Sequence, residues 1–420
     1  MKAFVVVDLG FGDAGKGTIV DWLVRREHAE LVVRFNGGAQ AGHNVVTDDG
    51  RHHTFAQLGA GSFVPGCRTH LAGTTVVHPG ALVVEEQWLR RAGVDDAWAR
   101  LTIAPDALVT TPFHQALGRV RELARAEPHG TCGVGVGETV RAMAAGLPVL
   151  RAGDLGRADL AERAEHVRCV LRGEAALLPV TTAAAPELAV LADPDVVLRW
   201  IASIRPLLDR GGDVIREASP ADRVVLEGAQ GVLLDEDHGF HPHTTWSRTT
   251  SEHAEAWASR AGFARADVVK LGVVRTYMTR HGPGPFPSET DALRALAEPH
   301  NPDDGWQGPF RRGWPDPILL RYAIRATGGV DGLALTHLDA LGSSAWRGVV
   351  RHAGAEGALD APALPDDLEA RERLTRRLAG CRAVLEPVPG EEAHFVAWLE
   401  DALGAPVTIR SRGPRPRDKA

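Results

Sequence analysis

The sequence predicts an α/β fold with a mostly parallel central sheet flanked by helices. Short apolar runs rich in β-branched residues recur along the chain, and each ends at a glycine-rich or polar segment. Runs of this kind are typical of strands buried on both faces of a parallel sheet. In addition, a strand, a glycine-rich turn, a helix and a second strand follow one another at the N-terminus, which is the order of a βαβ unit.

The N-terminal βαβ unit is predicted from three segments. Residues 3–7 (AFVVV) are an apolar, β-branched run that predicts a buried strand. Residues 18–26 (TIVDWLVRR) repeat apolar side chains at helical spacing, and residues 31–35 form a second apolar run. We therefore expect the glycine-rich segment between the first strand and the helix to connect the two directly.

Three later apolar runs predict further strands of the same sheet. Residues 223–226 precede the segment EGAQG, residues 268–274 precede RTYMTR, and residues 332–335 precede THLDAL. Because ligands in open α/β sheets bind at the carboxyl ends of the strands, we expect these three polar segments to form walls of one site.

The length and composition favour one large domain over two separable ones. The chain has 420 residues, of which 44% are hydrophobic, so it can bury a substantial core. A stretch rich in Ala, Leu, Pro and Thr at residues 174–193 predicts helices without an evident chemical function. We expect a single domain over residues 1–420 with inserted helical lobes.

Composition and charge argue against several classes of protein. No apolar run approaches the ~20 residues that cross a bilayer, and the chain begins without a basic and apolar leader, so we expect no membrane partner and no export. The net charge of −7 argues against a nucleic-acid partner. The four cysteines match no paired zinc spacing and indicate reduced thiols in a cytoplasmic protein. They are Cys67, Cys132, Cys169 and Cys381.

The glycine-rich turn GFGDAGKGT is a candidate phosphate-binding loop. Gly10, Gly15 and Lys16 have the spacing of a P-loop, in which backbone N–H groups and a lysine surround phosphate oxygens. The next position departs from that motif, because Gly17 stands where a P-loop has the Ser or Thr that holds Mg²⁺. A carboxylate, Asp13, lies inside the loop instead and can serve as a metal ligand or as a base. The alternative is a glycine-rich turn with a surface lysine.

A second glycine-rich loop, RFNGGAQAGH, follows the predicted strand at residues 31–35. It ends at His43, whose imidazole titrates near neutral pH and can give a proton to an oxygen that gains charge. A lone histidine is more often structural or solvated. Its position after a loop at a strand end raises the chance of a functional site.

These two loops resemble the paired N-terminal motifs of the adenylosuccinate synthetase family. The similarity continues in the same order along the chain. The later blocks are LAGTTVVHP (71–79), GTCGVGVG (130–137), VLEGAQGVLLDEDHGFHPHTTWSRTT (225–250), VVRTYMTRHGPGPFPSE (273–289), RRGWPD (311–316), LTHLDAL (335–341) and SRGP (411–414). Ordered blocks that span nearly the whole chain are stronger evidence than any single motif.

The resemblance implies a GTP-dependent ligase that joins aspartate to IMP. In that reaction the 6-oxygen of the base is first phosphorylated and is then displaced by the amine. An amide-like oxygen is a poor leaving group, and phosphorylation makes it a good one; the transfer needs mainly positioning and charge neutralisation. The resemblance also implies one Mg²⁺ per active site and a homodimer whose substrate sites are shared across the subunit interface.

The resemblance assigns the catalytic residues one by one. Asp13 would remove the N1 proton and bind Mg²⁺, and the carbonyl oxygen of Gly42 would complete the metal shell. His43 would act as the acid in the transfer of the γ-phosphoryl group. Gln230 would bind the nucleotide substrate and position the base, although a capping or turn residue is the alternative for this glutamine.

The resemblance also assigns a GTP site. Asp339 would accept hydrogen bonds from N1 and N2 of guanine, which selects guanine over adenine, unless it is instead a helix N-cap. His337 stands where the family has a lysine, so stacking on guanine is expected to be altered. The implied GTP-binding residues are Gly12, Gly15, Lys16, Gly17, Gly42, His337, Asp339, Ser411 and Gly413.

The substrate side departs from the family pattern. The implied substrate-binding residues are Gln40, Thr131, Cys132, Gln230, Thr245 and Arg311. Gln40 replaces an asparagine, Cys132 replaces a threonine that contacts phosphate, and Ala144 falls where the family has an arginine that reaches the neighbouring subunit. Pro309 replaces the first arginine of the loop that clamps aspartate, and a proline provides neither charge nor donor. Arg311 aligns with the family arginine nearest the γ-phosphate and the aspartate.

Two interpretations of these departures stay open. The chain is a divergent synthetase that acts on IMP and aspartate, or it is a paralogue from a specialised nucleoside or natural-product pathway that uses a different acceptor or amine with the same GTP chemistry. Two other classes are a GTP-binding switch protein and a non-catalytic scaffold. The presence of both Asp13 and His43 favours an enzyme over these.

Overall fold

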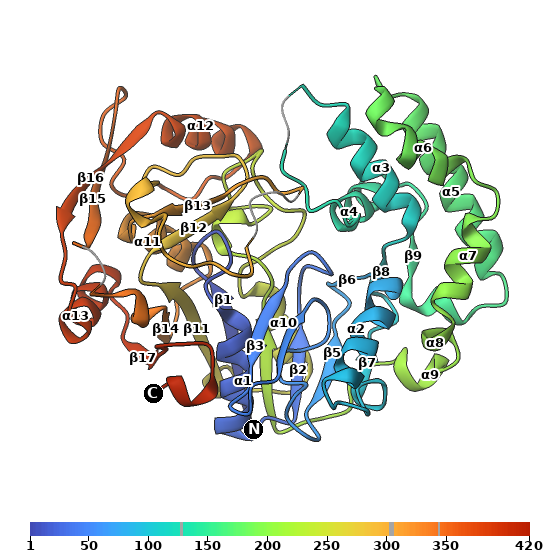
Figure 1. Cartoon of the computed structure of the whole chain (residues 1–420), viewed down its shortest axis with the longest axis horizontal. Helices are drawn as coiled ribbons and strands as arrows, with labels where there is room; N and C mark the ends of the chain where they lie inside the picture. Colours follow the sequence, from blue (N-terminus) through green and yellow to red (C-terminus); the bar gives the residue numbers. More distant parts are fainter. Residues whose placement is uncertain (127–128, 302–305, 343–344) are drawn as a thin grey trace.

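An eight-stranded parallel sheet forms the centre of the protein (Figure 1). This arrangement is seen in a computed structural model that describes residues 1–126, 129–301, 306–342 and 345–420. The strands, in their order across the sheet, are β17 (Val407–Arg410), β14 (Gly332–Thr336), β11 (Val268–Arg275), β1 (Lys2–Asp8), β10 (Arg223–Glu227), β2 (Leu31–Arg34), β5 (Arg68–Leu71) and β7 (Leu101–Ile103). Every pairing between neighbouring strands is parallel, which confirms the predicted fold class.

The predicted strands and the first helix lie within two residues of their observed ends. Helix α1 (Lys16–Glu27) connects β1 to β2, as the βαβ pattern predicts. It begins after Gly15, which has a left-handed backbone conformation, and it ends at His28, which adopts the same conformation. However, β1 and β2 are not neighbours, because β10 pairs with both of them. A strand from residues 223–227 therefore enters between two strands that are close in the sequence.

A lobe of helices lies beside the end of the central sheet that carries β5 and β7 (Figure 1). It is built mostly from residues 112–214 and corresponds to the predicted helical insertion. Its helices are α3 (Pro112–Leu123), α4 (Val136–Ala144), α5 (Leu160–Ala176), α6 (Ala185–Ala192), α7 (Val196–Ser203), α8 (Arg205–Leu208) and α9 (Gly211–Val214). The remaining helices are α2 (Pro79–Arg91), α10 (Glu252–Arg260), α11 (Pro317–Ala326), α12 (Leu368–Ala379) and α13 (Glu392–Leu403).

Four small sheets surround the carboxyl ends of the central strands and the outer edges of the molecule. They pair β3 (His43–Val46) with β4 (His52–Phe55), β12 (Met278–His281) with β13 (Phe310–Gly313), β15 (Arg347–Gly354) with β16 (Cys381–Pro387), and β8 (Leu108–Val109) with β6 (Val76–Val77) and β9 (Leu150–Arg151). No helix in the described part of the chain is long and apolar enough to cross a membrane.

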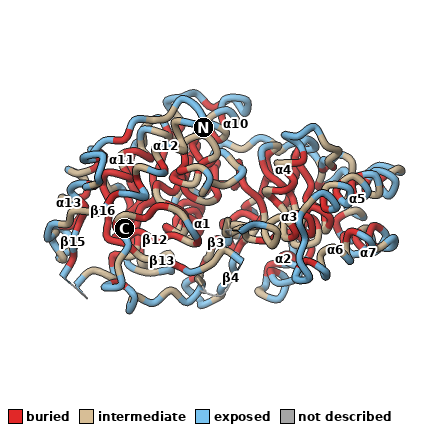
Figure 2. The backbone as a smooth tube through the Cα atoms, turned by 90° about the horizontal axis from the view of Figure 1, so that it is seen from above, coloured by how far each residue is buried: buried red, intermediate tan, exposed pale blue. Residues whose placement is uncertain are grey.

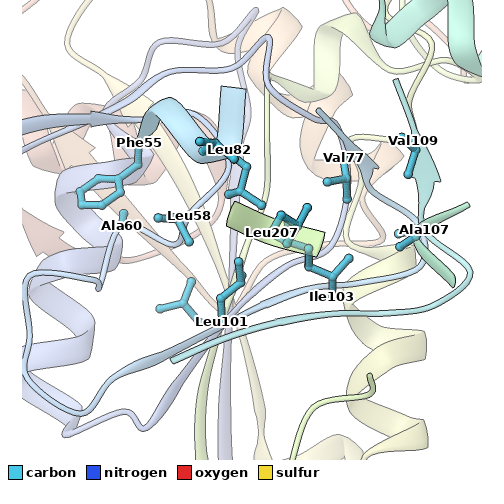
Figure 3. Packing of buried hydrophobic residues seen from close by; sticks show 14 of the residues in the cluster. Phe55, Leu58, Ala60, Val77, Leu82, Leu101, Ile103, Ala107, Val109 and Leu207 are labelled. Carbon is cyan, nitrogen blue, oxygen red and sulfur yellow. The ribbon is translucent and has the colours of Figure 1, made fainter. Parts of the chain in front are cut away.

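The core lies on both faces of the sheet, and buried backbone runs through both halves of the molecule (Figure 2). Along β1, Phe4 and Val6 face one apolar cluster, whereas Val5 and Val7 face the other, as expected for alternating side chains in a strand. Figure 3 shows the first cluster, in which Leu207 of the helical lobe packs with residues of the sheet and its loops. This shared core fixes the lobe, and with it the segment 130–137, relative to the carboxyl ends of the strands.

Candidate active site

A cavity of about 640 Å³ opens at the carboxyl ends of the central strands. The segments that follow β1, β10, β11 and β14 contribute to its wall, as do the loop before β3 and the segment before α4. All but one of the sequence-predicted site residues line it. These are Gly12, Asp13, Gly15, Lys16, Gly17, Gln40, Gly42, His43, Thr131, Cys132, Gln230, Thr245, His337, Asp339, Ser411 and Gly413. Residues from six distant parts of the sequence thus meet at one place.

The glycine loop is held from inside by Asp8, the last residue of β1. Its carboxylate accepts hydrogen bonds from the backbone N–H groups of Gly10 (2.8 Å) and Ala14 (2.9 Å). The second oxygen also pairs with the ammonium group of Lys16 at 3.0 Å, and both of these side chains are almost fully buried. This pair keeps the lysine at the cavity wall in a defined position.

Close packing explains why position 17 is glycine where a P-loop has Ser or Thr. A Cβ atom on Gly17 would lie 2.8 Å from Cβ of His43 and 2.9 Å from the carbonyl oxygen of Asn44. Strand β3 therefore approaches the start of α1 too closely for any larger residue. Because position 17 has no side chain, it lacks the hydroxyl that binds a metal in a P-loop. The same lack of a side chain allows His43 to lie next to the phosphate loop.

A similar contact fixes Gln230. A Cβ atom on Gly231 would lie 2.2 Å from the carbonyl oxygen of Gly10, so the segment after β10 packs directly on the glycine loop.

Strained backbone conformations are concentrated at the cavity. The structure gives a left-handed conformation to four described non-glycine residues, and three of them line the cavity. Those three are Asp13 (φ 60°), Gln230 (φ 63°) and His337 (φ 58°). Strained residues are concentrated at functional sites because the surrounding structure must hold them there.

The carboxylate of Asp13 faces an imidazole across the cavity. One of its oxygens lies 3.6 Å from Nε2 of His281, which follows β11 in the chain. Burial raises the pKa of Asp13, and the charges of His281 and Lys16 oppose this shift. A carboxyl group with a raised pKa is a stronger base than an ordinary surface aspartate.

The predicted acid, His43, forms a buried pair with a glutamate of the central sheet. Nδ1 of His43 lies 2.5 Å from a carboxylate oxygen of Glu227, the last residue of β10. The other oxygen of Glu227 accepts the backbone N–H of Ala60 at 2.9 Å. Burial, assisted by the charge of Arg34, lowers the pKa of His43 to about 4. The ring is therefore neutral at pH 7 before a ligand enters.

Several polar atoms of the cavity wall are buried without a hydrogen-bond partner in the described structure. They are Oε1 of Gln40, Nε2 of His43, Oε1 of Gln230, Nδ1 of His243 and Nδ1 of His281. Buried polar atoms in folded proteins almost always have partners. Five such atoms around one cavity indicate that a polar ligand supplies them.

The wall that the resemblance assigns to guanine is built from the ends of two neighbouring strands. Asp339 follows β14, and Ser411 follows β17; the backbone N–H of Leu338 donates to the carbonyl oxygen of Ser411 at 3.1 Å. The hydroxyl of Thr18, in α1, donates to the carbonyl oxygen of Pro414 at 2.6 Å. This contact ties the C-terminal segment to the phosphate loop. Asp339 is not the N-cap of a regular α-helix, since it lies within the 3₁₀ turn Leu338–Ala340.

The opposite wall, which we call the acceptor half, is formed by residues 129–137, 243–246 and 297–308 as far as they are described. Cys132 accepts a hydrogen bond from Nε2 of Gln307 at 2.9 Å, and the hydroxyl of Thr131 accepts the N–H of Gly133 at 3.3 Å. Burial raises the pKa of Cys132 to about 11, so this thiol is not a nucleophile at neutral pH.

Arg311 is the predicted site residue that does not line this cavity. Its guanidinium pairs with Glu289 at 2.5 Å and donates to the carbonyl oxygens of Gly282 (3.1 Å) and Gly284 (3.0 Å). Its side chain lines a separate crevice between the β12–β13 hairpin and α12. The similarity of sequence blocks could not reveal this, because it gives the position of a residue in the chain and not the direction of its side chain.

The oxygen atoms expected to bind Mg²⁺ lie at the cavity. Asp13 and Gly42 both line it, and a carboxylate and a carbonyl are hard oxygen donors that suit this ion. Within the described ranges, no group of three or more His, Cys, Asp or Glu side chains could hold a metal by itself. This fits Mg²⁺, which usually keeps waters and takes its remaining ligands from substrate phosphates.

Sequence reasoning did not single out Asp8, Glu227, His243 or His281. The position of Asp8 at a strand end directly before a glycine loop was a usable signal. The other three give no local signal, because their partners are 37 positions (His243 and Arg280), 184 positions (Glu227 and His43) and 268 positions (His281 and Asp13) away in the sequence.

Comparison with known proteins agrees with the motif blocks. A sequence profile of the family described as adenylosuccinate synthetase matches residues 5–420. The adenylosuccinate synthetase of Pseudomonas fluorescens is 33% identical over 431 residues, covering 98% of this chain and 96% of that protein. The chain belongs to the adenylosuccinate synthetase family. The enzyme of Pseudomonas syringae is likewise 33% identical with the same coverage. The chain is therefore a ligase of this GTP-using, C–N bond-forming type, a family of purine biosynthesis.

Solved structures show the same fold. The fully ligated adenylosuccinate synthetase of Plasmodium falciparum matches with a TM-score of 0.74 and 23% identity, covering 100% of this chain and 99% of that one. The succinoaminodeoxyadenylate synthetase of cyanophage S-2L matches with a TM-score of 0.59 and 19% identity, covering 100% of this chain and 95% of that one. That structure holds dGMP and dATP as an energy donor.

Proposed function

We propose that the protein uses GTP to phosphorylate the 6-oxo group of IMP, or of a related purine-like nucleotide, and then couples aspartate to form adenylosuccinate. The observation that carries the proposal is the convergence of Asp13, His43 and Gln230 on one cavity that also holds the phosphate loop. Asp339 at the far wall of the same cavity supports guanine as the base of the donor.

The protonation states of the empty site suit this reaction. Asp13, with a raised pKa, accepts the proton from N1 of the base, so that negative charge gathers on the 6-oxygen that attacks phosphorus. His281 lies 3.6 Å away and stabilises the ionised form of Asp13 before substrate binds. Gln230, held in a left-handed conformation, directs its amide to the base.

His43 and Lys16 act on the phosphate side. The negative charge of a bound triphosphate raises the pKa of His43 from its low value, since opposite charges favour the ionised form. The protonated ring then donates from Nε2 to a phosphate oxygen that gains charge. Bound Mg²⁺, held by Asp13 and the carbonyl oxygen of Gly42, would neutralise phosphate charge. Lys16 supplies a further fixed positive charge.

The charge of the cavity wall favours a second candidate substrate pair, in which the amine is not aspartate. Of the described residues that line the cavity, the lysines and arginines are Lys16 and Arg280. Arg280 is buried, lies over the ring of Phe11 and donates to the carbonyl oxygens of Pro283 (3.2 Å) and Pro285 (2.9 Å). It is thus already occupied by protein acceptors.

Two histidines of the acceptor half, His129 and His243, do not replace the missing charge. Burial lowers the pKa values of His129 and of His243, the latter to about 4, so both rings are neutral at pH 7. A dicarboxylate amine needs matched cations, so an amine other than aspartate is the alternative.

Phosphate release from GTP and Mg²⁺ separates these possibilities. We expect release that requires both IMP and aspartate. Release that requires IMP but is faster with a neutral or cationic amine supports the second candidate. Slow release independent of both co-substrates indicates a GTP-binding switch, and no release with any acceptor or amine contradicts the enzyme. ATP and dATP in place of GTP test the selection attributed to Asp339.

We also expect a homodimer, and Ala144 provides no arginine that could reach the active site of the neighbouring subunit. Ala144 lies at the end of α4 on the surface, beside the exposed side chain of Met143. Light scattering of the active protein tests this, and a fully active monomer contradicts it.

A further inference from the structure

The pair formed by His43 and Glu227 joins two elements that are far apart in the sequence. His43 begins β3 at the cavity wall, whereas Glu227 ends β10 in the middle of the central sheet. Glu227 has no exposed surface and His43 is 5% exposed. A carboxylate buried this deeply is costly unless its oxygens are matched by donors.

Both oxygens of Glu227 have a defined donor. Nδ1 of His43 lies 2.5 Å from one oxygen, and the backbone N–H of Ala60 lies 2.9 Å from the other. Although burial opposes it, Arg34 and His43 hold the pKa of Glu227 below its ordinary value. The ionised carboxylate accepts only, so the proton of the neutral imidazole is on Nδ1. Nε2 then presents its lone pair to the cavity, where it has no partner in the described structure.

A second histidine–carboxylate pair in the molecule shows what a structural version looks like. Nε2 of His352, in β15, lies 2.7 Å from a carboxylate oxygen of Asp316, and neither residue has exposed surface. The other oxygen of Asp316 accepts backbone N–H groups at the start of α11. Both pairs join a buried imidazole to a buried carboxylate, through Nδ1 in His43 and Nε2 in His352, but of the two histidines only His43 lines the cavity.

We propose that Glu227 is a positioning residue for the reaction: its buried carboxylate accepts from Nδ1 and so fixes the orientation and tautomer of His43, with Nε2 facing the cavity. This inference rests on the proposed function of His43. The charged groups around the ring are Glu227 from β10, Arg34 from β2 and Lys16 from α1. Glu227 is the one among them that can accept a hydrogen bond from the ring.

The substitution Glu227→Gln tests the proposal because it keeps the shape and removes the charge. Glutamine offers one acceptor and one donor group. If the amide oxygen of the glutamine still accepts the N–H of Ala60, the NH₂ group of the glutamine faces Nδ1 of His43. The imidazole proton must then move from Nδ1 to Nε2. A general acid or base held in the wrong tautomer loses a factor of about 10² to 10⁴ in rate.

The kinetic test measures GTP-dependent phosphate release at one fixed pH. For Glu227→Gln we expect kcat to fall by about 10²-fold or more with KM for GTP changed less than about threefold. Glu227→Asp, which keeps the charged acceptor, should recover part of kcat.

Asp316→Asn is the matched control, since it removes the same kind of buried charge away from the cavity. We expect it to lower the melting temperature by an amount similar to Glu227→Gln and to leave kcat unchanged. Equal losses of kcat in the two variants would overturn the proposal.

An NMR measurement that does not depend on turnover tests the inference even if the proposed function is wrong or the variant does not fold. ¹⁵N-histidine NMR of the unliganded wild-type protein, with His43→Asn to assign the signal, reports which ring nitrogen carries the proton. We expect Nδ1–H at pH 7, and Nε2–H in Glu227→Gln. A wild-type ring protonated on Nε2 overturns the inference, whatever reaction the enzyme catalyses.

Discussion

The two halves of the cavity are built in opposite ways. The phosphate half holds its side chains with buried charges and strained backbone: Lys16 is paired with Asp8, and His43 with Glu227. The acceptor half contains hydroxyls, a thiol and histidines, and the pKa values of His129 and His243 are lowered by burial. Arg280, the one arginine among the described residues that line the cavity, already donates to carbonyl oxygens of the protein. In the phosphate half, replacing one member of a buried pair leaves its partner unpaired, so these residues cannot be substituted one at a time. The residues of the acceptor half can be substituted one at a time, so the choice of amine can change more easily than phosphoryl transfer.

Asp13→Asn should give the largest effect on the phosphate half. Asparagine tolerates the left-handed conformation of this residue, so the loop should keep its shape. It cannot accept a proton from the substrate. We expect coupled phosphate release to fall by about 10³-fold or more, with the affinity for GTP changed less than about fivefold in equilibrium binding. Coupling at the normal rate would show that another group is the base.

Lys16→Met should give the next largest effect and should act on stability as well. Removing one partner of a buried ion pair costs about 3–5 kcal/mol, because Asp8 is left without its counter-charge. We expect KM for GTP to rise about 10²-fold and the melting temperature to fall.

The double variant Asp8→Asn, Lys16→Met separates these two consequences. It removes both charges and should recover part of the melting temperature while the weak affinity for GTP remains. If GTP affinity returns with stability, the lysine acts through the fold and not on the phosphates.

The same contrast marks the limit of what the sequence could predict. The strands, the glycine loop and α1 follow from local patterns, and so does the meeting of Asp13, Gln230 and Asp339 at strand ends. The pairing of His43 with Glu227 does not, because it depends on β10 entering between β1 and β2. Gly17 looked like a defect in a P-loop, and only the 2.8 Å approach of His43 shows why it is required.

The loop around residues 300–312 was the least predictable part. Arg311 was expected at the substrate, but a local ion pair with Glu289 and two carbonyl oxygens hold it in another crevice. An alignment transfers the identity of a residue and not the direction of its side chain.

Asp339→Asn tests the wall that joins the phosphate half to the C-terminal segment. A carboxylate that accepts two donors from guanine contributes about 1.5–3 kcal/mol per charged hydrogen bond. Replacing one acceptor oxygen by an NH₂ group should reduce the preference for GTP over ATP by about 10-fold or more. Competition binding with both nucleotides measures it; an unchanged preference would place guanine recognition elsewhere.

Pro309→Arg should give the smallest effect and tests the acceptor half directly. Pro309 is exposed next to Gly308, which lines the cavity, so an arginine there can extend toward a carboxylate of the amine. If the missing charge limits the use of aspartate, KM for aspartate should fall about 10-fold, the contribution of one exposed charge-assisted hydrogen bond. KM for GTP should not change, because the two halves are separate. Pro309→Gln, which has a similar reach without charge, is the matched control. Equal KM values for aspartate in both variants would show that charge at this loop does not determine the amine.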